Sequence, residues 1–266
     1  MTRPSPAPRD GEGPPTLAIA NAVATIRLRR PSQRNSLLDE DLHALLVHFA
    51  QVDADPAIRV VVLAAQTEGN ARPVFSAGYH VGGFDSGAHD PLLFEQVPDA
   101  LERLRPVTVC ALNGSVYGGA TDLVLACDLR IGLLGTEFRM PATALGLHYY
   151  PSGLRRYVSR LGLNTAKRAF LTAQALPIEQ LHALGLFDCL TDGAGFDAAL
   201  AALVQTVAGL APLAVQATKQ SLNEIAAGLF DEPAMRAREA LTGASADFAE
   251  GRAAFAARRP PRFSGR

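Results

Sequence analysis

The sequence predicts an α/β core that is followed by a region made almost wholly of helices. Over the first two thirds of the chain, continuous apolar runs alternate with loops and helix starts, and no repeat of roughly 20 to 50 residues is visible. The last third is rich in Ala and Leu at helical spacing. With 266 residues, of which 48% are apolar and 19% charged types, the chain can bury a sizeable core as one large domain or two small ones.

The chain is expected to open with a hairpin and a helix. Residues 16–20 and 23–28 are short β-type runs on either side of a two-residue turn, which predicts two paired strands. After the breaker segment 30–35 the period changes, and a helix is expected to start near Asp39 and to fade before Asp55. The apolar positions of this helix fall at i, i+3, i+4 and i+7, namely Leu42, Leu45, Leu46 and Phe49.

Three further apolar runs, rich in β-branched residues, are expected to form strands buried on both faces. These runs are residues 60–65, 107–112 and 129–133. A Gly-rich helix start lies between the second and the third of them. The succession of strand, loop, helix and strand is typical of an α/β core.

From about Asn164 onward the chain is expected to be helical. The predicted helices are residues 164–172, 178–184, 196–209, 212–227 and 233–255. The final segment, which contains Pro260, is expected to be irregular because proline cannot continue a helix. We therefore divide the chain into a flexible leader at residues 1–15, a core at residues 16–195 and a C-terminal helical region at residues 196–266.

Charge and composition exclude or disfavour several classes of function. With 25 Lys and Arg against 26 Asp and Glu, the net charge of −1 offers no basic excess for a nucleic acid partner. No apolar stretch approaches the roughly 20 residues that span a bilayer, and the leader lacks the apolar stretch of a secretory signal. For this reason we expect no membrane partner. The three cysteines show no metal-ligand spacing, so we expect no metal site. Buried, reduced thiols are expected instead, which fits a cytoplasmic protein.

Two Gly-containing segments are the candidates for a site. Residues 73–80 follow the first buried strand, and their Ala77-Gly78 pair would let the backbone come close to a ligand. Residues 113–122 follow the second buried strand and open a helix, so their N–H groups can be directed at an anion or oxyanion. A purely structural turn explains the glycines of this segment equally well. The segment has neither the spacing GxGxxG nor GxxxxGK[ST], so it is not a nucleotide fingerprint.

The two segments resemble the two oxyanion motifs of the crotonase (enoyl-CoA hydratase/isomerase) family. The first resemblance is carried by Phe75-Ser76-Ala77-Gly78-Tyr79 and the second by Asn113-Gly114 through Gly118-Gly119. The flanking motifs also fall in the family's order, and the resemblance extends over residues 16–263. These flanking motifs are Arg30-Pro31, Asn35-Ser36, Cys127-Asp128 and Met140-Pro141 to Gly146.

The resemblance implies a core of repeated β-β-α turns that form a spiral. It also implies that the helical region at residues 196–266 assembles homotrimers, often as a dimer of trimers. The family binds acyl-CoA thioesters, so coenzyme A is expected as part of the substrate and no separate cofactor is expected. Matched residue by residue, the amides of Tyr79 and Gly119 would hold the thioester oxygen. Contacts with coenzyme A are expected from Ala77, Gly78, Arg30 and Arg259.

The sequence departs from the hydratases of this family at both catalytic glutamates. Asp122 stands at the first position and Ala142 at the second. An aspartate could act as a base through one water, but a methyl group cannot replace the second acid. Local stretches resemble the methylmalonyl-CoA decarboxylase branch, in which a tyrosine corresponding to Tyr149 lies near the substrate carboxylate. The match is partial, because Tyr79-His80 stands where that branch has His-Asp.

Each candidate side chain also has a structural explanation. His80 could be a solvated loop histidine, Tyr149 could pack against a neighbouring helix, and Asp122 could pair with an arginine. Arg259 could reach a coenzyme A phosphate, including that of a neighbouring subunit, or could simply be solvated.

The sequence supports two hypotheses for the function. The first is an enzyme that stabilises a thioester enolate and acts as a hydratase, isomerase or decarboxylase, and the second is a non-catalytic acyl-CoA binder.

Overall fold

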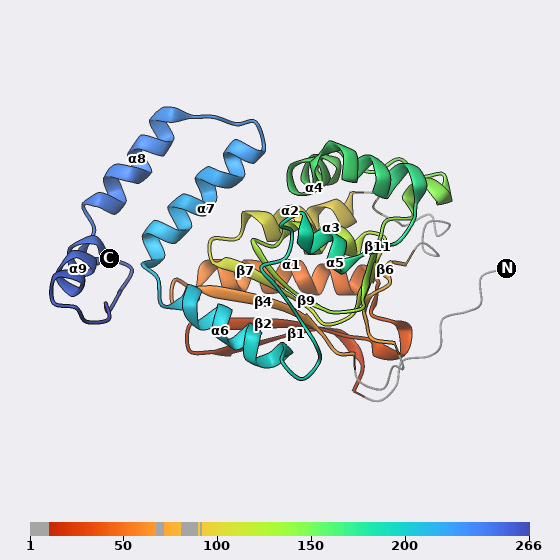
Figure 1. Ribbon diagram of the computed structural model, residues 1–266, viewed down its shortest axis with the longest axis horizontal. Helices are drawn as coiled ribbons and strands as arrows, with labels where there is room; N and C mark the ends of the chain where they lie inside the picture. The colour runs from red at the N-terminus through yellow and green to blue at the C-terminus, as the bar shows by residue number, and fades with distance from the viewer. Residues whose placement is uncertain (1–10, 68–71, 81–89, 91) are drawn as a thin grey trace.

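A six-stranded sheet runs through the centre of the protein (Figure 1). The computed structural model describes residues 11–67, 72–80, 90 and 92–266. The sheet has the strand order β1-β2-β4-β7-β9-β12, in which β1 and β2 are antiparallel and the other neighbours are parallel. The strands are β1 (Gly13–Ala20), β2 (Val23–Arg29), β4 (Val60–Ala65), β7 (Val107–Leu112), β9 (Leu129–Leu133) and β12 (Cys189–Thr191).

The predicted hairpin and the three predicted buried strands are confirmed, and β4 and β7 are buried at every position. The hairpin begins earlier than expected, because β1 starts at Gly13, inside the predicted leader at residues 1–15. Arg29 holds this start, since its guanidinium donates to the carbonyl oxygens of Gly11 at 2.9 Å and Pro14 at 3.1 Å. Residues 1–10 of the predicted leader lie outside the described residues.

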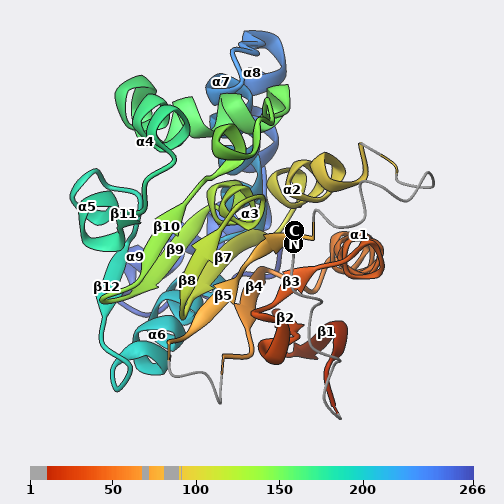
Figure 2. The same cartoon turned by 90° about the vertical axis from the view of Figure 1, so that its right-hand side faces the viewer.

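A second, smaller sheet lies beside the first and has the order β11-β10-β8-β5 (Figure 2). Its strands are β5 (Val74–Ser76), β8 (Ser115–Tyr117), β10 (Glu137–Arg139) and β11 (Leu176–Pro177), and a separate pair is formed by β3 (Ser36–Leu37) and β6 (Gly78–Tyr79). Three times in succession the chain lays down a strand of the large sheet, then one of the small sheet, then a helix. These repeated β-β-α turns are the spiral core that the resemblance implies.

Helices cover both faces of the large sheet. One face packs in a core with α1 (Asp39–Ala54), α2 (Leu93–Arg103) and α3 (Ala120–Ala126), followed in the chain by α4 (Pro151–Thr172) and α5 (Ile178–Ala183). The other face is covered by α6 (Phe196–Ala208), whose Phe196 and Val207 pack with valines of β4 and β7. The predicted helix from Asp39 is confirmed. Helix α4 begins at Pro151, where proline occupies a favoured first helical position, and it is broken at Gly162, which has a φ of +72°. Its second part contains the helix predicted at residues 164–172.

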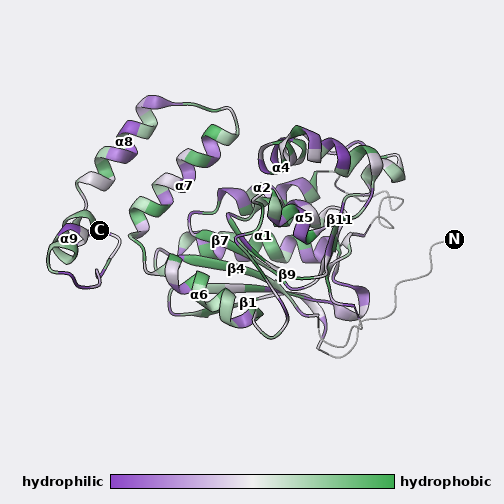
Figure 3. Cartoon of the chain, viewed as in Figure 1, coloured by the Kyte–Doolittle hydropathy of each residue, from purple (hydrophilic) through white to green (hydrophobic). Residues whose placement is uncertain are grey.

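The C-terminal helices extend away from the sheets (Figure 1). They are α7 (Pro212–Ala226), α8 (Glu232–Gly243) and α9 (Ala246–Ala256). The single helix predicted at residues 233–255 is therefore two helices, because Ser245 caps α9 by accepting a hydrogen bond from the Phe248 amide at 3.1 Å. Apolar residues alternate with polar ones along α7 and α8 (Figure 3), and several large apolar side chains stay exposed, including Phe230 and Phe255.

Among the described residues, no single helix is long and apolar enough to cross a membrane. The consecutive helices α6 and α7 are together long and apolar enough to do so, but the chain bends by 102° between them.

Candidate active site

The two Gly-containing segments meet backbone to backbone. Strands β5 and β8 pair in parallel, which brings the turns that follow them to the same end of the small sheet. Gly78 has a φ of +91°, and a Cβ atom at this position would lie 2.6 Å from the Tyr117 carbonyl oxygen and 3.2 Å from the Gly119 nitrogen. Only glycine combines this conformation with such a close approach. The contact therefore depends on Gly78.

Hydrogen bonds to the segment after β2 fix the first turn. Ser76 donates through Oγ to the Asn35 carbonyl oxygen at 2.6 Å, and its Oγ accepts from the Gly78 amide at 3.1 Å. The Ala77 amide donates to the Arg34 carbonyl oxygen at 2.8 Å, and the His80 amide donates to that of Leu37 at 2.9 Å. The Arg30-Pro31 and Asn35-Ser36 motifs thus belong to the scaffold of this turn.

Gly119 is the residue before the first turn of α3, and its N–H belongs to the group that has no carbonyl partner inside the helix. The ring of Phe94, from α2, covers it closely. A Cβ at Gly119 would lie 2.5 Å from Cζ of Phe94. The same ring lies 5.5 Å from the Tyr79 ring and 6.1 Å from the Tyr150 ring, measured between centroids.

A cavity of about 590 Å³ opens at this contact. It is large enough for a small acyl group. Its walls combine backbone of both glycine turns with aromatic and aliphatic side chains. The lining residues are Ala77, Tyr79, Leu92, Phe94, Glu95, Gly118, Gly119, Met140, Pro141, Ala142, Leu145, Leu147, His148, Tyr149, Tyr150 and Pro151.

Four predicted site residues therefore line one cavity: Ala77, Tyr79, Gly119 and Tyr149. The Tyr79 hydroxyl donates to Asp39, and burial, together with this carboxylate, raises the pKa of Tyr79 above its usual value. Gly78 supports the cavity from behind through its contact with Gly119. Among the described residues, His80 is outside the cavity lining.

Asp122 lies behind the cavity wall and is completely buried. Arg156 holds both of its oxygens, with Nε donating to Oδ1 at 2.9 Å and Nη2 donating to Oδ2 at 2.7 Å. The Tyr150 hydroxyl also donates to Oδ2. Burial by itself lowers the pKa of Arg156, but the hydrogen bonds and charges of Asp122, Asp99 and Glu102 together outweigh burial and raise it. Asp122 thus reaches the cavity through Tyr150.

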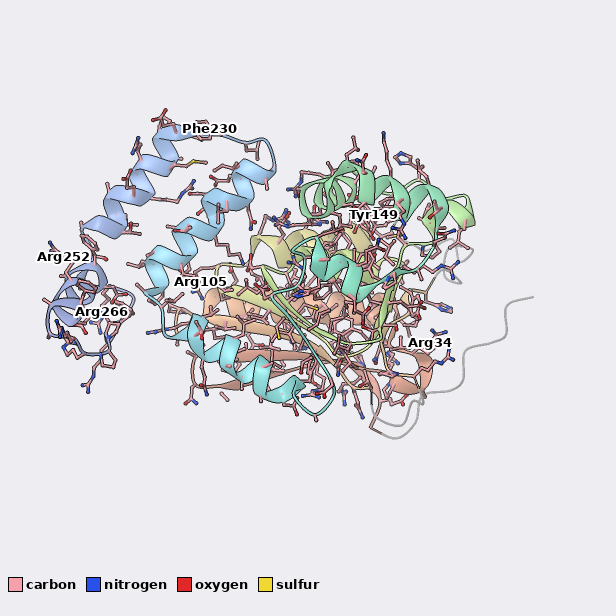
Figure 4. All side chains as sticks on the ribbon, in the orientation of Figure 1. Arg34, Arg105, Tyr149, Phe230, Arg252 and Arg266 are labelled. Atoms are coloured by element: carbon pink, nitrogen blue, oxygen red, sulfur yellow. The ribbon has the colours of Figure 1, made fainter. Side chains whose placement is uncertain are left out.

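Tyr149 and Tyr150 lie side by side in the cavity lining, next to His148. Their ring centroids are 4.2 Å apart, and the two phenolic oxygens are 3.1 Å apart. Tyr149, which is labelled near α4 in Figure 4, also packs against Tyr157 and Phe170 of that helix. Burial and, after it, the charge of Asp122 raise the pKa of both phenols well above the usual value. Both are therefore neutral near pH 7.

The two arginines predicted to contact coenzyme A lie elsewhere in the chain. Arg30 is buried and pairs with Asp41, at 3.0 Å from Nε to Oδ2, and with Glu40. Arg259 follows α9, at the opposite side of the molecule from α4 (Figure 1), and pairs with Glu250 at 2.6 Å. One chain does not bring either arginine to the cavity. Their contact with coenzyme A stays a prediction, which for Arg259 requires a neighbouring subunit.

Sequence reasoning missed the contribution of α2. Phe94 covers Gly119, and Glu95 is the acidic side chain among the described residues that line the cavity. The signal was present in the spacing of Leu93, Val97 and Leu101 at i, i+4 and i+8, which predicts a helical face. Pro98 lies inside that pattern and obscures it.

Repeated β-β-α turns that carry a cavity at the meeting point of two glycine turns define an α/β class of spiral proteins with a helical C-terminal region. A family model described as enoyl-CoA hydratase/isomerase matches residues 18–266. The chain belongs to this family.

Curated relatives and solved structures agree with this assignment. The chain is 31% identical to the Mycobacterium leprae protein named "Probable enoyl-CoA hydratase echA6", over 92% of this chain and 97% of that one. It is 24% identical to methylmalonyl-CoA decarboxylase of Escherichia coli, over 92% and 95% of the two chains. A structure described as an enoyl-CoA hydratase/isomerase family protein from Hyphomonas neptunium superposes with a TM-score of 0.85 and 27% identity, over 95% of this chain and 98% of that one.

Proposed function

We propose that the protein binds acyl-CoA thioesters and stabilises a thioester enolate with the amides of Tyr79 and Gly119. The observation that carries this proposal is the backbone contact between the two glycine turns at the edge of the cavity. An enolate places negative charge on the thioester oxygen. Fixed N–H donors stabilise that charge without reorganising, so they act selectively on the transition state.

The side chains around the cavity favour a reaction that needs at most one carboxylate. Asp122 is engaged by Arg156 and Tyr150, and Ala142 provides no acid. Glu95 remains as a carboxylate at the cavity. It can take a proton from one carbon of the acyl chain and return it to another, as in isomerisation of a double bond. Decarboxylation needs no base, because the electrons of the broken carbon–carbon bond pass into the enolate.

A panel of thioesters separates these reactions. The protein is incubated in turn with crotonyl-CoA, a 3-enoyl-CoA and methylmalonyl-CoA, and the products are followed by mass spectrometry. Hydration adds water to crotonyl-CoA and decarboxylation removes carbon dioxide from methylmalonyl-CoA. Isomerisation moves the double bond without a change in mass and is followed by the absorbance of the conjugated thioester. Failure to bind or turn over any of the three contradicts the proposed function.

A second candidate is a non-catalytic acyl-CoA binder. The clamped carboxylate of Asp122 and the methyl group of Ala142 favour it, because neither hydratase glutamate has a working replacement at its own position. Tight binding of acyl-CoA by calorimetry, without turnover of any thioester in the panel, would support this candidate over the enzyme.

We also propose that the protein works in the cytoplasm as a homotrimer or as a dimer of trimers. The exposed apolar side chains of the C-terminal region support the assembly, because a neighbouring subunit could cover them. They include Leu222 of α7, Phe230 of the loop before α8 and Phe255 of α9. Sedimentation velocity measures the state directly.

A further inference from the structure

We infer that the position of helix α7 is coupled to the acyl cavity through a buried network of charges that runs from Asn223 to Tyr150. The network joins α7 to α2, α4 and the cavity wall, so a neighbouring subunit that displaces α7 changes the affinity of the cavity. This inference rests on the proposed acyl-CoA function and adds a form of regulation to it. Asn223 is a positioning residue in this scheme.

Helix α7 is held to the core with little burial of its own side chains. Of its 15 residues, all of which the structure describes, Pro212 alone is buried. Two cavities, of about 600 and 640 Å³, lie along the helix, and Lys219 and Asn223 line both. Lys219 donates to the Pro106 carbonyl oxygen at 2.8 Å and pairs with Asp128 at 2.7 Å. A helix attached by so few buried contacts can shift at low cost in free energy.

Asn223 connects α7 to two helices of the core. It lies one turn after Lys219 and on the same face of α7. Its Nδ2 donates to the carbonyl oxygen of Glu102, in α2, at 3.2 Å. Its Oδ1 accepts from Nη2 of Arg160, in α4, at 3.1 Å. One amide side chain thus links α7 to α2 and to α4, and its removal breaks both bonds at once.

Glu102 carries the connection from α7 into the core. The residue is buried, and its Oε2 accepts from Nη1 of Arg156 at 3.2 Å. The same guanidinium holds both oxygens of Asp122. Asp122 in turn accepts from the Tyr150 hydroxyl in the cavity lining. Every link from α7 to the cavity is therefore a direct hydrogen bond.

The network has a second arrangement available where Glu102 meets Arg160. Oε1 of Glu102 and Nε of Arg160 are both buried, and among the described residues neither atom has a hydrogen-bond partner. Nη2 of Arg160 lies 3.6 Å from this Oε1, just beyond hydrogen-bond length. Because unpaired buried donors and acceptors are costly, a small shift that joins them lowers the free energy. When α7 releases Arg160, its guanidinium can bind this oxygen and draw Glu102 away from Arg156.

The two arrangements link events at α7 to events in the cavity. A ligand that contacts Tyr150 favours one position of Asp122, and contact of a neighbouring subunit with α7 favours one position of Arg160. Thermodynamic linkage requires that each event affects the other to the same extent. Substitutions along networks of this kind change ligand affinity by about 2- to 30-fold.

A double-mutant cycle tests the inference. The variants are Asn223→Ala, Tyr150→Phe and the two combined. The control is Gln220→Ala, because Gln220 lines one of the same cavities but bonds only within α7, to Glu224 at 2.9 Å. The dissociation constant of butyryl-CoA is measured by calorimetry for each protein. Asn223→Ala should change it by more than about twofold and Gln220→Ala by less. In the Tyr150→Phe background the effect of Asn223→Ala should disappear, because the last link is gone.

Hydrogen–deuterium exchange without ligand provides a second readout. Asn223→Ala should speed exchange of the backbone amides at residues 146–154, which surround Tyr150, and Gln220→Ala should not. Thermal melting of the same samples shows that the variants are folded.

A change in affinity below about twofold in Asn223→Ala, or persistence of its effect in the Tyr150→Phe background, would overturn the inference while leaving the acyl-CoA function in place. Unchanged exchange at residues 146–154 in Asn223→Ala would overturn it whether or not the ligand binds. If the wild type does not bind butyryl-CoA, the proposed function itself fails.

Discussion

Replacement of Gly119 by proline removes one of the two proposed oxyanion donors and gives the sharpest test of the proposed function. Gly119 has a φ of −56°, which lies within the range that proline adopts. The substitution therefore deletes the N–H without demanding a new value of φ. Loss of one such donor costs about 2.7–4 kcal/mol, which is about 10²–10³ in rate.

The matched control is Gly119→Ala, which keeps the N–H. Both variants place a Cβ at about the same point, 2.5 Å from Cζ of Phe94, so both must displace this ring. The difference between the two variants therefore isolates the N–H and the ring atoms of proline from the crowding of Phe94.

The assay should report the enolate whatever its later fate. We suggest deuterium incorporation at the α-carbon of butyryl-CoA in heavy water, followed by mass spectrometry, with the dissociation constant measured on the same samples. Gly119→Ala is expected to retain exchange, and Gly119→Pro to lose at least about 10²-fold relative to it. Equal exchange rates in the two variants, with both proteins folded by circular dichroism, would refute the role given to this amide.

Three further predictions follow from the same geometry. Glu95→Gln should lower α-carbon exchange about 10²-fold or more while leaving thioester affinity within about twofold, and an unchanged rate would exclude Glu95 as the proton carrier. Asp122→Asn leaves buried Arg156 without its full counter-charge, so thermal melting should show a loss of about 3–5 kcal/mol in unfolding free energy. A loss below about 1 kcal/mol would contradict the stabilising role of the Asp122–Arg156 ion pair. Gly78→Ala should abolish exchange because its Cβ would lie 2.6 Å from a backbone oxygen, whereas Gly146→Ala, at a similar φ of +75° but in open space, should keep exchange and cost about 1 kcal/mol in a melting experiment.

The longer strands of the large sheet could be predicted from the sequence because burial on both faces selects largely apolar runs, whereas the three-residue β12 could not. Residues 60–65, 107–112 and 129–133 coincide with β4, β7 and β9. The strands of the small sheet could not, because runs of two or three residues carry no usable period. The boundary between α8 and α9 depends on the N-cap residue Ser245. It was missed because the Ala-rich sequence on both sides favours an uninterrupted helix.

The backbone part of the site could be predicted, and its side-chain part could not. Gly78 is visible in the sequence because close backbone approach at a positive φ leaves few alternatives to glycine, and Gly119 follows in the same kind of Gly-rich turn. The contact of Asp122 with Arg156 depends on how α3 packs against α4, which no local pattern reveals. The same packing directs the Tyr150 hydroxyl to the Asp122 carboxylate, so this contact is also a property of the tertiary structure.

The main-chain contact between the two glycine turns separates two tasks that many enzymes assign to the same side chains. In the proposed function the polypeptide backbone holds the negative oxygen, and a side-chain substitution cannot remove these N–H groups except at the glycines themselves. The side chains that line the cavity, such as Glu95 and Tyr149, can vary without changing this backbone contact. A protein built in this way can acquire a new reaction, or lose its own and become a carrier, through few substitutions and with its scaffold unchanged.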